Sequence, residues 1–421
     1  GVYGKASALS TFDNVLNHTR NGNATMVDAD GLLKWAPHNL QPYSENLASI
    51  GWTFSGSLAD DFQTIRENST TSSHSYRETL GRSYLLGDIY TVEFKVKRGV
   101  GGRNVRFNQG NANILPFSTL IDLGSGAFLS GNRAGDTISA LGADGFYAVK
   151  LTRTVGLTGA TQLYIFMLDG TSTSYTGDNT STINVKEYTI YRSDLGGMVN
   201  NPATGDSYVP TTDAARYLPR ENHHVYNGSA WVKEGYLHEP EAATNLVTHS
   251  SDFTDSSWTK SGATVTANAA VAPDGTTTAD EVIPSTTALS VRFDAPSSSL
   301  VHTVSLWVKD AGRGSCFVAM GSSTRGYLIN LDLTDGSYIS GRSYGGGVLS
   351  SYSIVSGGNG WYRVSVAASA LGVTGILIAG GDGVSSASGI YIWGAQLEAG
   401  SVPTSYIPTS GSTVTRAADT L

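Results

Sequence analysis

Two stretches of the chain, Thr-Val-Glu-Phe-Lys-Val-Lys at residues 91–97 and Thr-Val-Ser-Leu-Trp-Val-Lys at residues 303–309, share one pattern. In the second stretch, Val304, Leu306 and Val308 alternate with Ser305 and Trp307. A period of two is typical of a strand with one face in a core and the other face turned outward. Both stretches are therefore predicted to be β-strands at equivalent places in two related modules.

Further matches between the two halves of the chain occur in the same order around these strands. Asn39-Leu40 and Trp52-Thr53 precede the first strand, as Asn245-Leu246 and Trp258-Thr259 precede the second. Downstream, Gly-Phe-Tyr-Ala-Val-Lys-Leu at 145–151 corresponds to Gly-Trp-Tyr-Arg-Val-Ser-Val at 360–366. Ordered matches of this kind indicate a duplicated module.

The composition favours an all-β protein. Only 15% of the residues are charged, whereas the 421 residues include 50 Gly, 21 Tyr and 7 Trp. Glycine and aromatic residues in this abundance suit short strands joined by tight turns. Asp-Gly turn signals recur at residues 144–145, 169–170, 274–275, 335–336 and 382–383. The predicted fold is two tandem jelly-roll-type β-sandwich modules with extended connecting arms.

Five segments are expected along the chain. An N-terminal arm (1–38) precedes the first sandwich module (39–198), and a connector (199–240) leads to the second module (241–400) and a C-terminal exit arm (401–421). The connector contains a hairpin-like pattern at residues 225–232. Ser-Tyr-Val-Pro-Thr at 207–211 resembles Ser-Tyr-Ile-Pro-Thr at 405–409, so both modules are expected to end in the same kind of arm.

Charge and cysteine content exclude several classes of function. The formal net charge of -8 argues against binding to nucleic acid, which requires a basic stripe, and against adhesion to anionic membranes. No apolar run is long enough to cross a bilayer, and the first residues lack a secretory pattern. Cys316 is the single cysteine, which excludes an intrachain disulfide and predicts a small buried thiol on a strand.

Several motifs in the second half resemble those of tailed-phage and gene-transfer-agent proteins that form head spikes, head fibres or tail fibres. They are Ala-Pro-Asp-Gly-Thr-Thr-Thr-Ala-Asp at 272–280, Ser-Leu-Trp-Val-Lys at 305–309, Gly-Trp-Tyr-Arg-Val at 360–364 and Ile-Trp-Gly-Ala-Gln-Leu-Glu at 392–398. The resemblance implies carbohydrate-binding-like jelly-roll modules that attach a particle to host surface polysaccharide. It covers nearly all of residues 240–421 and is weaker over 39–198, where Lys95 and Phe146 replace Trp307 and Trp361.

A candidate glycan-binding face follows from the alternation of the strands. Sugar binding uses flat aromatic faces together with a few polar groups. Outward positions in the second module hold Trp307, Trp361, Arg363, Tyr391 and Trp393. The alternative is that these outward side chains pack on an arm, a loop or a neighbouring subunit. By contrast, Trp52 and Trp258, which recur at the start of each module, are expected to be structural plugs.

No catalytic residues are identified, and the chain is not expected to be an enzyme. The acidic residues show no facing pair suited to glycoside hydrolysis. Asp280 and Glu281 are candidate Ca²⁺ ligands, and no other cofactor is indicated. The adjacent histidines His223 and His224 would point to opposite faces of a strand, so they predict a polar connector.

Together these features predict a virion-surface fibre or spike protein, on the head or on the tail, that binds host surface polysaccharide without catalysis. Its other expected partners are virion structural proteins and further copies of itself, because repetition strengthens weak sites. A trimer is expected by analogy with fibres. The alternatives are a purely structural particle protein and a polysaccharide depolymerase.

Overall fold

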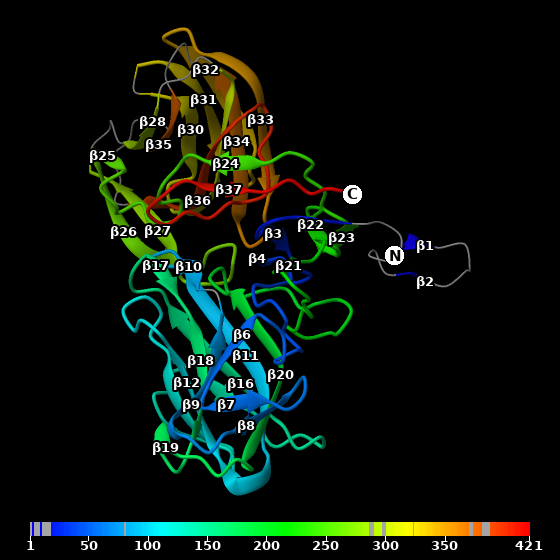
Figure 1. Ribbon diagram of the computed structural model, residues 1–421. Coiled ribbons are helices and arrows are strands. Elements are labelled where there is room, and N and C mark those ends of the chain that lie inside the picture. Colours follow the sequence, from blue (N-terminus) through cyan, green and yellow to red (C-terminus); the bar gives the residue numbers. More distant parts are fainter. Residues whose placement is uncertain are drawn as a thin grey trace. The chain divides into compact units, whose positions relative to one another are not determined.

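The computed structural model describes residues 2–3, 9–10, 18–79, 81–285, 290–296, 300–322, 324–369, 374–380 and 388–421 (Figure 1). These residues form two compact units. Unit 1 comprises Gly1–Ala36 and Pro219–Leu421, and unit 2 comprises Pro37–Leu218. Residues 1–36 of the N-terminal arm and 219–240 of the connector therefore group with the second sandwich, whereas residues 199–218 of the connector group with the first. The turn expected at residues 382–383 lies outside the described residues.

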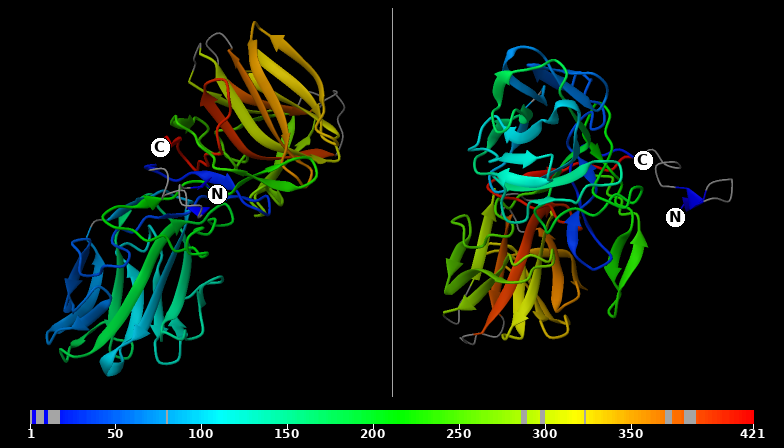
Figure 2. Two further views of the ribbon diagram at one scale, coloured as in Figure 1. Left: turned by 90° about the vertical axis from the view of Figure 1, so that its right-hand side faces the viewer. Right: turned by 90° about the horizontal axis from the view of Figure 1, so that it is seen from below.

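Nearly all regular structure in the described residues is β, and a single 3-10 turn at Val100–Gly102 is the helical exception. Within those residues no helix has the length and apolar character needed to span a membrane. The predicted all-β class is confirmed, as are the two β-sandwiches in tandem, whose paired sheets are visible in Figures 1 and 2.

Unit 2 is a sandwich of two antiparallel sheets. We call the sheet next to the exit arm the arm-side sheet and its partner the opposite sheet. The arm-side sheet has the order β15 (Thr137–Ile138), β16 (Tyr147–Thr154), β11 (Ile89–Arg98), β20 (Thr182–Arg192), β8 (Thr64–Glu67), β7 (Ser57–Ala59). The opposite sheet has the order β14 (Ala127–Ser130), β13 (Ser118–Asp122), β12 (Asn104–Gln109), β18 (Leu163–Leu168), β9 (Thr71–Glu78), with β6 (Trp52–Ser55) and β19 (Ser174–Thr176) both paired to β9. The pairs β10 (Arg82–Tyr84) with β17 (Gly159–Thr161) and β5 (His38–Asn39) with β21 (Arg216–Tyr217) complete the unit.

Unit 1 repeats this sandwich. Its arm-side sheet has the order β33 (Val348–Ser356), β34 (Trp361–Ser369), β29 (His302–Ala311), β36 (Gly389–Ala399), β27 (Ala279–Pro284), β26 (Ala263–Ala270). Its opposite sheet has the order β32 (Tyr338–Tyr344), β31 (Gly326–Asp332), β30 (Ser315–Gly321), β35 (Thr374–Gly380), β28 (Ser290–Ala295), β25 (Thr259–Ser261). Four short pairs lie outside the sandwich: β1 (Val2–Tyr3) with β2 (Leu9–Ser10), β3 (Thr25–Val27) with β4 (Leu33–Trp35), β22 (His223–Tyr226) with β23 (Trp231–Gly235), and β24 (Ala243–Asn245) with β37 (Val414–Arg416).

Strand order and hydrogen bonding confirm the duplication. Reading each sheet in the order given, every strand of the unit 1 sandwich has a counterpart in unit 2, and β19 is an additional strand of unit 2. Asn39 donates from Nδ2 to the carbonyls of Tyr188 and Val209. Asn245 donates in the same way to the carbonyls of Ala395 and Ile407. Each asparagine therefore ties its arm-side sheet to the exit arm of its own unit.

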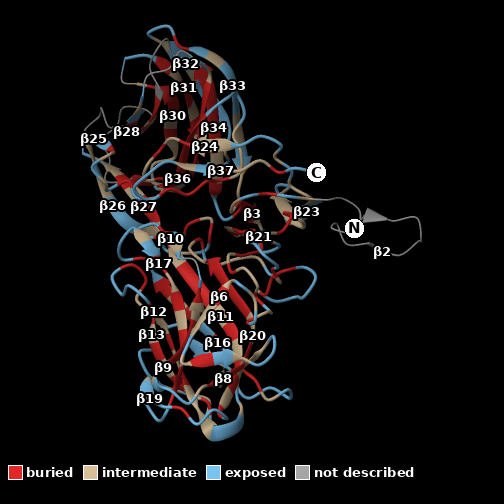
Figure 3. Cartoon of the chain, in the orientation of Figure 1, coloured by how far each residue is buried: buried red, intermediate tan, exposed pale blue. Residues whose placement is uncertain are grey.

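The two cores are built from the inward halves of the alternating strands (Figure 3). Val304, Leu306 and Val308 are fully buried, as the period of two predicts. The expected structural plugs are confirmed, because Trp52 and Trp258 are buried in the core clusters of their units. Cys316 is also fully buried, and burial raises the pKa of its thiol. This confirms the small buried thiol on a strand that the sequence predicts.

Candidate functional site

A cavity of about 310 Å³ lies in unit 1 against the outer face of the arm-side sheet. This volume is at the small end of the range for ligand pockets, roughly 300–1,000 Å³. The sheet supplies the floor, the exit arm one side, and the short pairs β3–β4 and β22–β23 the remaining walls. The residues that line the cavity include Val27, His223, His224, Tyr226, Trp231, Trp307, Ser353, Val355, Arg363, Ser365, Thr404 and Tyr406.

Trp307 and Arg363 form the centre of the floor. They are register partners on β29 and β34, so both side chains leave the same face of the sheet. The Arg363 guanidinium lies 4.8 Å from the centroid of the Trp307 ring, within the distance of a cation–π contact. Arg363 also donates from Nη2 to the carbonyl of Thr404 at 2.6 Å, which joins the floor to the exit arm.

Tyr226 and Trp231 form an aromatic wall on the β22–β23 hairpin. Their ring centroids are 5.3 Å apart, and the turn between them is closed by hydrogen bonds to Asn227 Oδ1. The indole of Trp231 packs against two glycines. A methyl group added at Gly31 would lie 2.0 Å from the indole, and one at Gly358 would lie 3.3 Å away. Close backbone approach on both sides fixes the position of this wall.

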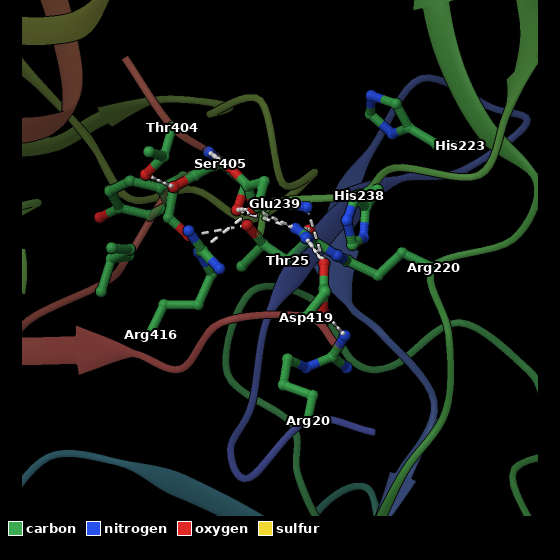
Figure 4. A network of polar contacts seen from close by, with 12 residues as sticks. Arg20, Thr25, Arg220, His223, His238, Glu239, Thr404, Ser405, Arg416 and Asp419 are labelled. Carbon is green, nitrogen blue, oxygen red and sulfur yellow. Dashed lines mark hydrogen bonds and ion pairs between the residues drawn. The ribbon is translucent and has the colours of Figure 1, made fainter. Parts of the chain in front are cut away.

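A buried ion network holds the arms that complete the cavity (Figure 4). Arg220 donates to Glu239 Oε2 and to Asp419 Oδ2, each at 2.6 Å. Asp419 also accepts from Arg20 at 2.9 Å. Burial acts to raise the pKa of Asp419, but the His18 hydrogen bond and the Arg220 charge outweigh it and hold that pKa far below its usual range. The network thus joins the N-terminal arm, the connector and the exit arm through ionised groups.

Polar groups in the cavity wall are placed to donate and accept hydrogen bonds. His223 Nδ1 accepts from the Val27 amide at 3.1 Å, and burial lowers the pKa of this histidine to about 4. His223 is therefore neutral at pH 7 and carries its proton on Nε2. Arg363 Nε and His224 Nδ1 are buried and have no hydrogen-bond partner among the described residues. Buried polar atoms of this kind usually bond to water or to a ligand.

The five aromatic and polar side chains predicted as a glycan face do not form one exposed surface. Trp307 is 6% exposed, Trp361 3% and Trp393 1%. Their outward direction follows the alternation of the strands, yet a loop and an arm of the same unit cover them. Trp361 Nε1 donates to the Val271 carbonyl at 3.2 Å, and Trp393 Nε1 donates to Thr278 Oγ1 at 3.1 Å.

Trp307 and Arg363 are the two predicted residues that the structure brings together at the cavity. Trp393 packs beneath them, with its ring centroid 5.4 Å from that of Trp307 and 4.9 Å from that of Tyr406. Tyr391 is half-buried, and its register partner on β27 is Glu281. Trp361 and Tyr391 lie outside the lining of the cavity.

The aromatic wall was not among the predicted site residues. Tyr226 and Trp231 lie in the segment expected to be a connector, and the hairpin pattern at 225–232 predicted their strand pair correctly. The signal that was available is two aromatic residues facing each other across an Asn-Gly turn. Nothing local indicates which body a hairpin packs against, so the sequence alone does not reveal a cavity wall.

The two candidate Ca²⁺ ligands do not share a site. Asp280 and Glu281 are adjacent on β27, so their carboxylates leave opposite faces of the sheet. The Asp280 oxygens accept from the backbone amides of Phe253 at 2.9 Å and Asn268 at 3.0 Å. Across the described part of the chain, no cluster of three or more His, Cys, Asp or Glu side chains is placed to hold a metal ion.

Unit 2 has a cavity of about 340 Å³ at the equivalent place on its own arm-side sheet. Its wall is charged where that of unit 1 is aromatic. Lys95, which stands at the position of Trp307, pairs with Glu187 at 2.6 Å. Lys150 pairs with Glu93 at 3.2 Å, and Tyr191 donates to the same carboxylate at 2.6 Å. Most of the charged groups here are thus engaged with one another.

No protein-family model and no curated protein matches this sequence. Among solved structures, the CBM22-1–CBM22-2 tandem domain of Paenibacillus barcinonensis Xyn10C is 10% identical, covers 87% of this chain and 98% of its own, and has a TM-score of 0.26. A Paenibacillus cycloisomaltooligosaccharide glucanotransferase, in complex with cycloisomaltoheptaose, is 10% identical, covers 84% of this chain and 46% of its own, and has a TM-score of 0.16. At these TM-scores neither likeness carries an argument about ligand or activity.

Proposed function

We propose that this chain is a non-catalytic glycan-binding protein on the surface of a virion or virus-like particle, where it serves as a spike or fibre that attaches the particle to host surface polysaccharide. The observation that supports glycan binding most directly is the cavity of unit 1. It combines the aromatic wall of Tyr226 and Trp231 with the Arg363 guanidinium and a neutral His223. An apolar wall with a few convergent polar groups suits a sugar ring, which has one apolar face and a rim of hydroxyls.

Serine and threonine hydroxyls complete the polar part of the cavity. Ser353 and Ser365 are register partners on β33 and β34, and their hydroxyls lie 2.8 Å apart. Each hydroxyl both donates and accepts, which matches the hydroxyls of a neutral or weakly charged sugar. Placement on a particle rests on the motif resemblance at 272–280, 305–309 and 360–364. A homo-oligomer, taken as a trimer, would strengthen weak single sites by repetition.

The second candidate is a purely structural particle protein, and a specific observation favours it. The indoles of Trp307, Trp361 and Trp393 are covered by parts of unit 1 itself, so they stabilise the arms. On this alternative the cavity wall is a by-product of arm packing and another chain recognises the host.

The test separates the two candidates with a variant that fills the mouth of the cavity. Val355 lines the cavity and is 53% exposed, so Val355→Arg places a long side chain there without disturbing the core. Val348→Arg is the matched control, because Val348 lies on the same strand, is 60% exposed and does not line the cavity. Purified protein is mixed with capsular polysaccharides from candidate hosts and followed by size-exclusion chromatography.

Co-elution at unchanged polymer size, weakened about tenfold or more by Val355→Arg and not by Val348→Arg, is the expected result. Binding that both variants retain would remove the cavity from the proposal. Absence of binding to every polysaccharide would favour the structural candidate. Shortening of the polymer would overturn the non-catalytic assignment.

A further inference from the structure

The opposite sheet of unit 2 carries two parallel aromatic rings on its outer face. Tyr164 and Phe166 lie two residues apart on β18, with ring centroids 5.8 Å apart and an angle of 10° between the ring planes. Ile165, between them, is buried in the core, so the two rings leave the sheet on its outer side. Both side chains are half-buried. We call this pair the aromatic strip.

Polar side chains flank the strip on both neighbouring strands. The register places Tyr164 between Asn108 on β12 and Arg77 on β9. It places Phe166 between Arg106 on β12 and Ser75 on β9. These six side chains form two adjacent rows across one face of the sheet, because register partners in an antiparallel pair lie on the same face.

The two arginines are oriented by contacts within the face. Arg77 Nη1 donates to the Tyr164 hydroxyl at 2.9 Å, and Arg106 Nη2 donates to Ser118 Oγ at 2.7 Å. Arg106 Nε is buried and has no hydrogen-bond partner among the described residues. A guanidinium that is held in place through one nitrogen presents a fixed positive charge, which is suited to a carboxylate or sulfate group.

The charge of this face is opposite to that of the chain. The two rows contain two arginines and no carboxylate, whereas the whole chain has a formal net charge of -8. We infer that the aromatic strip with Arg77 and Arg106 is a second glycan-binding surface, and that it takes an acidic polysaccharide, such as a chain of uronate residues. The inference rests on the proposed function for the class of ligand, but it concerns a different unit and a different sheet.

Short polar side chains favour a glycan over single-stranded nucleic acid as the occupant. Rings and arginines together also suit stacked bases, but nucleic-acid grooves carry a run of positive charge that follows the backbone. Here the strip is bordered by Ser75, Asn108, Ser118 and, next to Arg77, Thr53. Hydroxyl and amide groups at these places match sugar hydroxyls.

Unit 1 provides an internal control, because its equivalent face lacks the strip. Leu377 occupies the place of Tyr164, and Ala319 and Leu328 occupy the places of Asn108 and Ser118. Arg292 corresponds to Arg77 but pairs with Asp294 at 3.0 Å. An acidic glycan is therefore expected to bind the opposite sheet of unit 2 and not that of unit 1.

The experiment is affinity electrophoresis of the full chain in native gels that contain alginate, a uronate polymer, or dextran, a neutral one. A separate titration uses a single-stranded DNA oligonucleotide. Phe166→Ala removes half of the strip. Asn108→Glu leaves both rings in place and adds a carboxylate beside them, so it tests the surface even if the alanine variant folds poorly. Val355→Arg, which blocks the cavity of unit 1, is included to keep the two sites apart.

We expect retardation by alginate that weakens as salt is raised, because the arginine contacts are screened. Phe166→Ala and Asn108→Glu should each weaken it about tenfold or more, and Val355→Arg should leave it unchanged. This result supports the inference even if the unit 1 cavity binds nothing. Absence of alginate retardation, retardation that both strip variants retain, its loss in Val355→Arg alone, or DNA binding at least as strong as alginate binding would overturn it.

Discussion

The two sandwiches share one strand order but differ in the aromatic side chains that they place on the outer faces of their sheets. In unit 1 the indoles of Trp307, Trp361 and Trp393 lie on the arm-side sheet and are buried under arms and loops. In unit 2 the equivalent sheet has Lys95 at the Trp307 position, and the parallel rings of Tyr164 and Phe166 lie on the opposite sheet. The same arrangement of strands thus carries different side chains on its outer faces.

This difference indicates how the duplicated modules have diverged. Contacts that build the sandwich are kept in both units. Asn39 and Asn245 each bond the exit arm of their own unit, and in each unit a serine hydroxyl bonds a tyrosine hydroxyl of that arm. Ser44 Oγ lies 2.9 Å from the Tyr208 hydroxyl, and Ser250 Oγ lies 2.7 Å from the Tyr406 hydroxyl. Outward positions have no such constraint, so each unit has its own surface chemistry.

The largest expected loss of stability concerns the position that Trp307 occupies in unit 1 and Lys95 in unit 2. Trp307→Ala should destabilise unit 1 by about 3–5 kcal/mol, since it removes a buried indole from Trp393, Tyr406 and Arg363. The equivalent Lys95→Ala should change unit 2 by less than about 1 kcal/mol, because the Lys95–Glu187 pair is partly exposed. Hydrogen exchange measured on peptides of each unit during urea titration checks both values. Equal losses of stability would mean that Trp307 and Lys95 contribute equally to the stability of their units.

The arrangement of strands was predictable from the sequence, whereas of the cavity only Trp307 and Arg363 were among the predicted site residues. Alternation at 303–309 correctly placed Val304, Leu306 and Val308 inside and Trp307 outside, because the period of a strand is a local property. Whether an outward indole meets solvent depends on arms distant in sequence, such as Thr404–Tyr406 over Trp307 and the loop with Thr278 over Trp393. The Tyr226–Trp231 wall was missed for the same reason.

A second prediction tests the buried asparagine that both units share. Asn39 and Asn245 are fully buried, and each side chain makes four hydrogen bonds to backbone groups. Replacing either one by alanine leaves these groups unpaired, which should cost about 3 kcal/mol in its own unit and leave the other unit unchanged. Peptide-resolved hydrogen exchange measures this, with the exposed Asn113→Ala as control. A variant that destabilises both units equally would contradict the assignment of each exit arm to its own sandwich.

A third prediction concerns how the stability of unit 1 depends on pH. Burial, aided by the Arg220 charge, lowers the pKa of His223 to about 4, against about 6.5 in an unfolded chain. Between these values the unfolded chain binds the additional proton, so the stability that His223 contributes to unit 1 is complete above pH 6.5 and falls as the pH drops toward 4. The loss should be about 2–3 kcal/mol.

Thermal unfolding at pH 7 and pH 4.5 measures this loss against His223→Asn. The amide of that variant is placed to accept from the Val27 amide and does not titrate. Asp419, whose pKa is held far below its usual range, stays ionised over the whole window, so the arm network persists in both proteins. Equal acid sensitivity of the two proteins would rule out a buried neutral His223.

The smallest expected effect concerns a contact that both units keep across a change of residue. Lys97 Nζ lies 4.6 Å from the Phe146 ring in unit 2, and Lys309 Nζ lies 5.9 Å from the Trp361 ring in unit 1. An indole attracts a cation more strongly than a phenyl ring does, but the unit 1 pair is farther apart, and Lys186 also lies over Phe146 at 4.5 Å. Lys97→Met and Lys309→Met should each cost about 0.5–1 kcal/mol, as measured by urea titration at low salt.

A second substitution tests whether a lysine still faces each ring. In the Lys97→Met background, Phe146→Leu should still remove a cation–π contribution, because Lys186 remains over Phe146. In the Lys309→Met background, Trp361→Leu should remove no further cation–π contribution. A cation–π contribution that remains in unit 1 but not in unit 2 would show that the identity of the ring, and not the number of facing lysines, sets the strength of this contact.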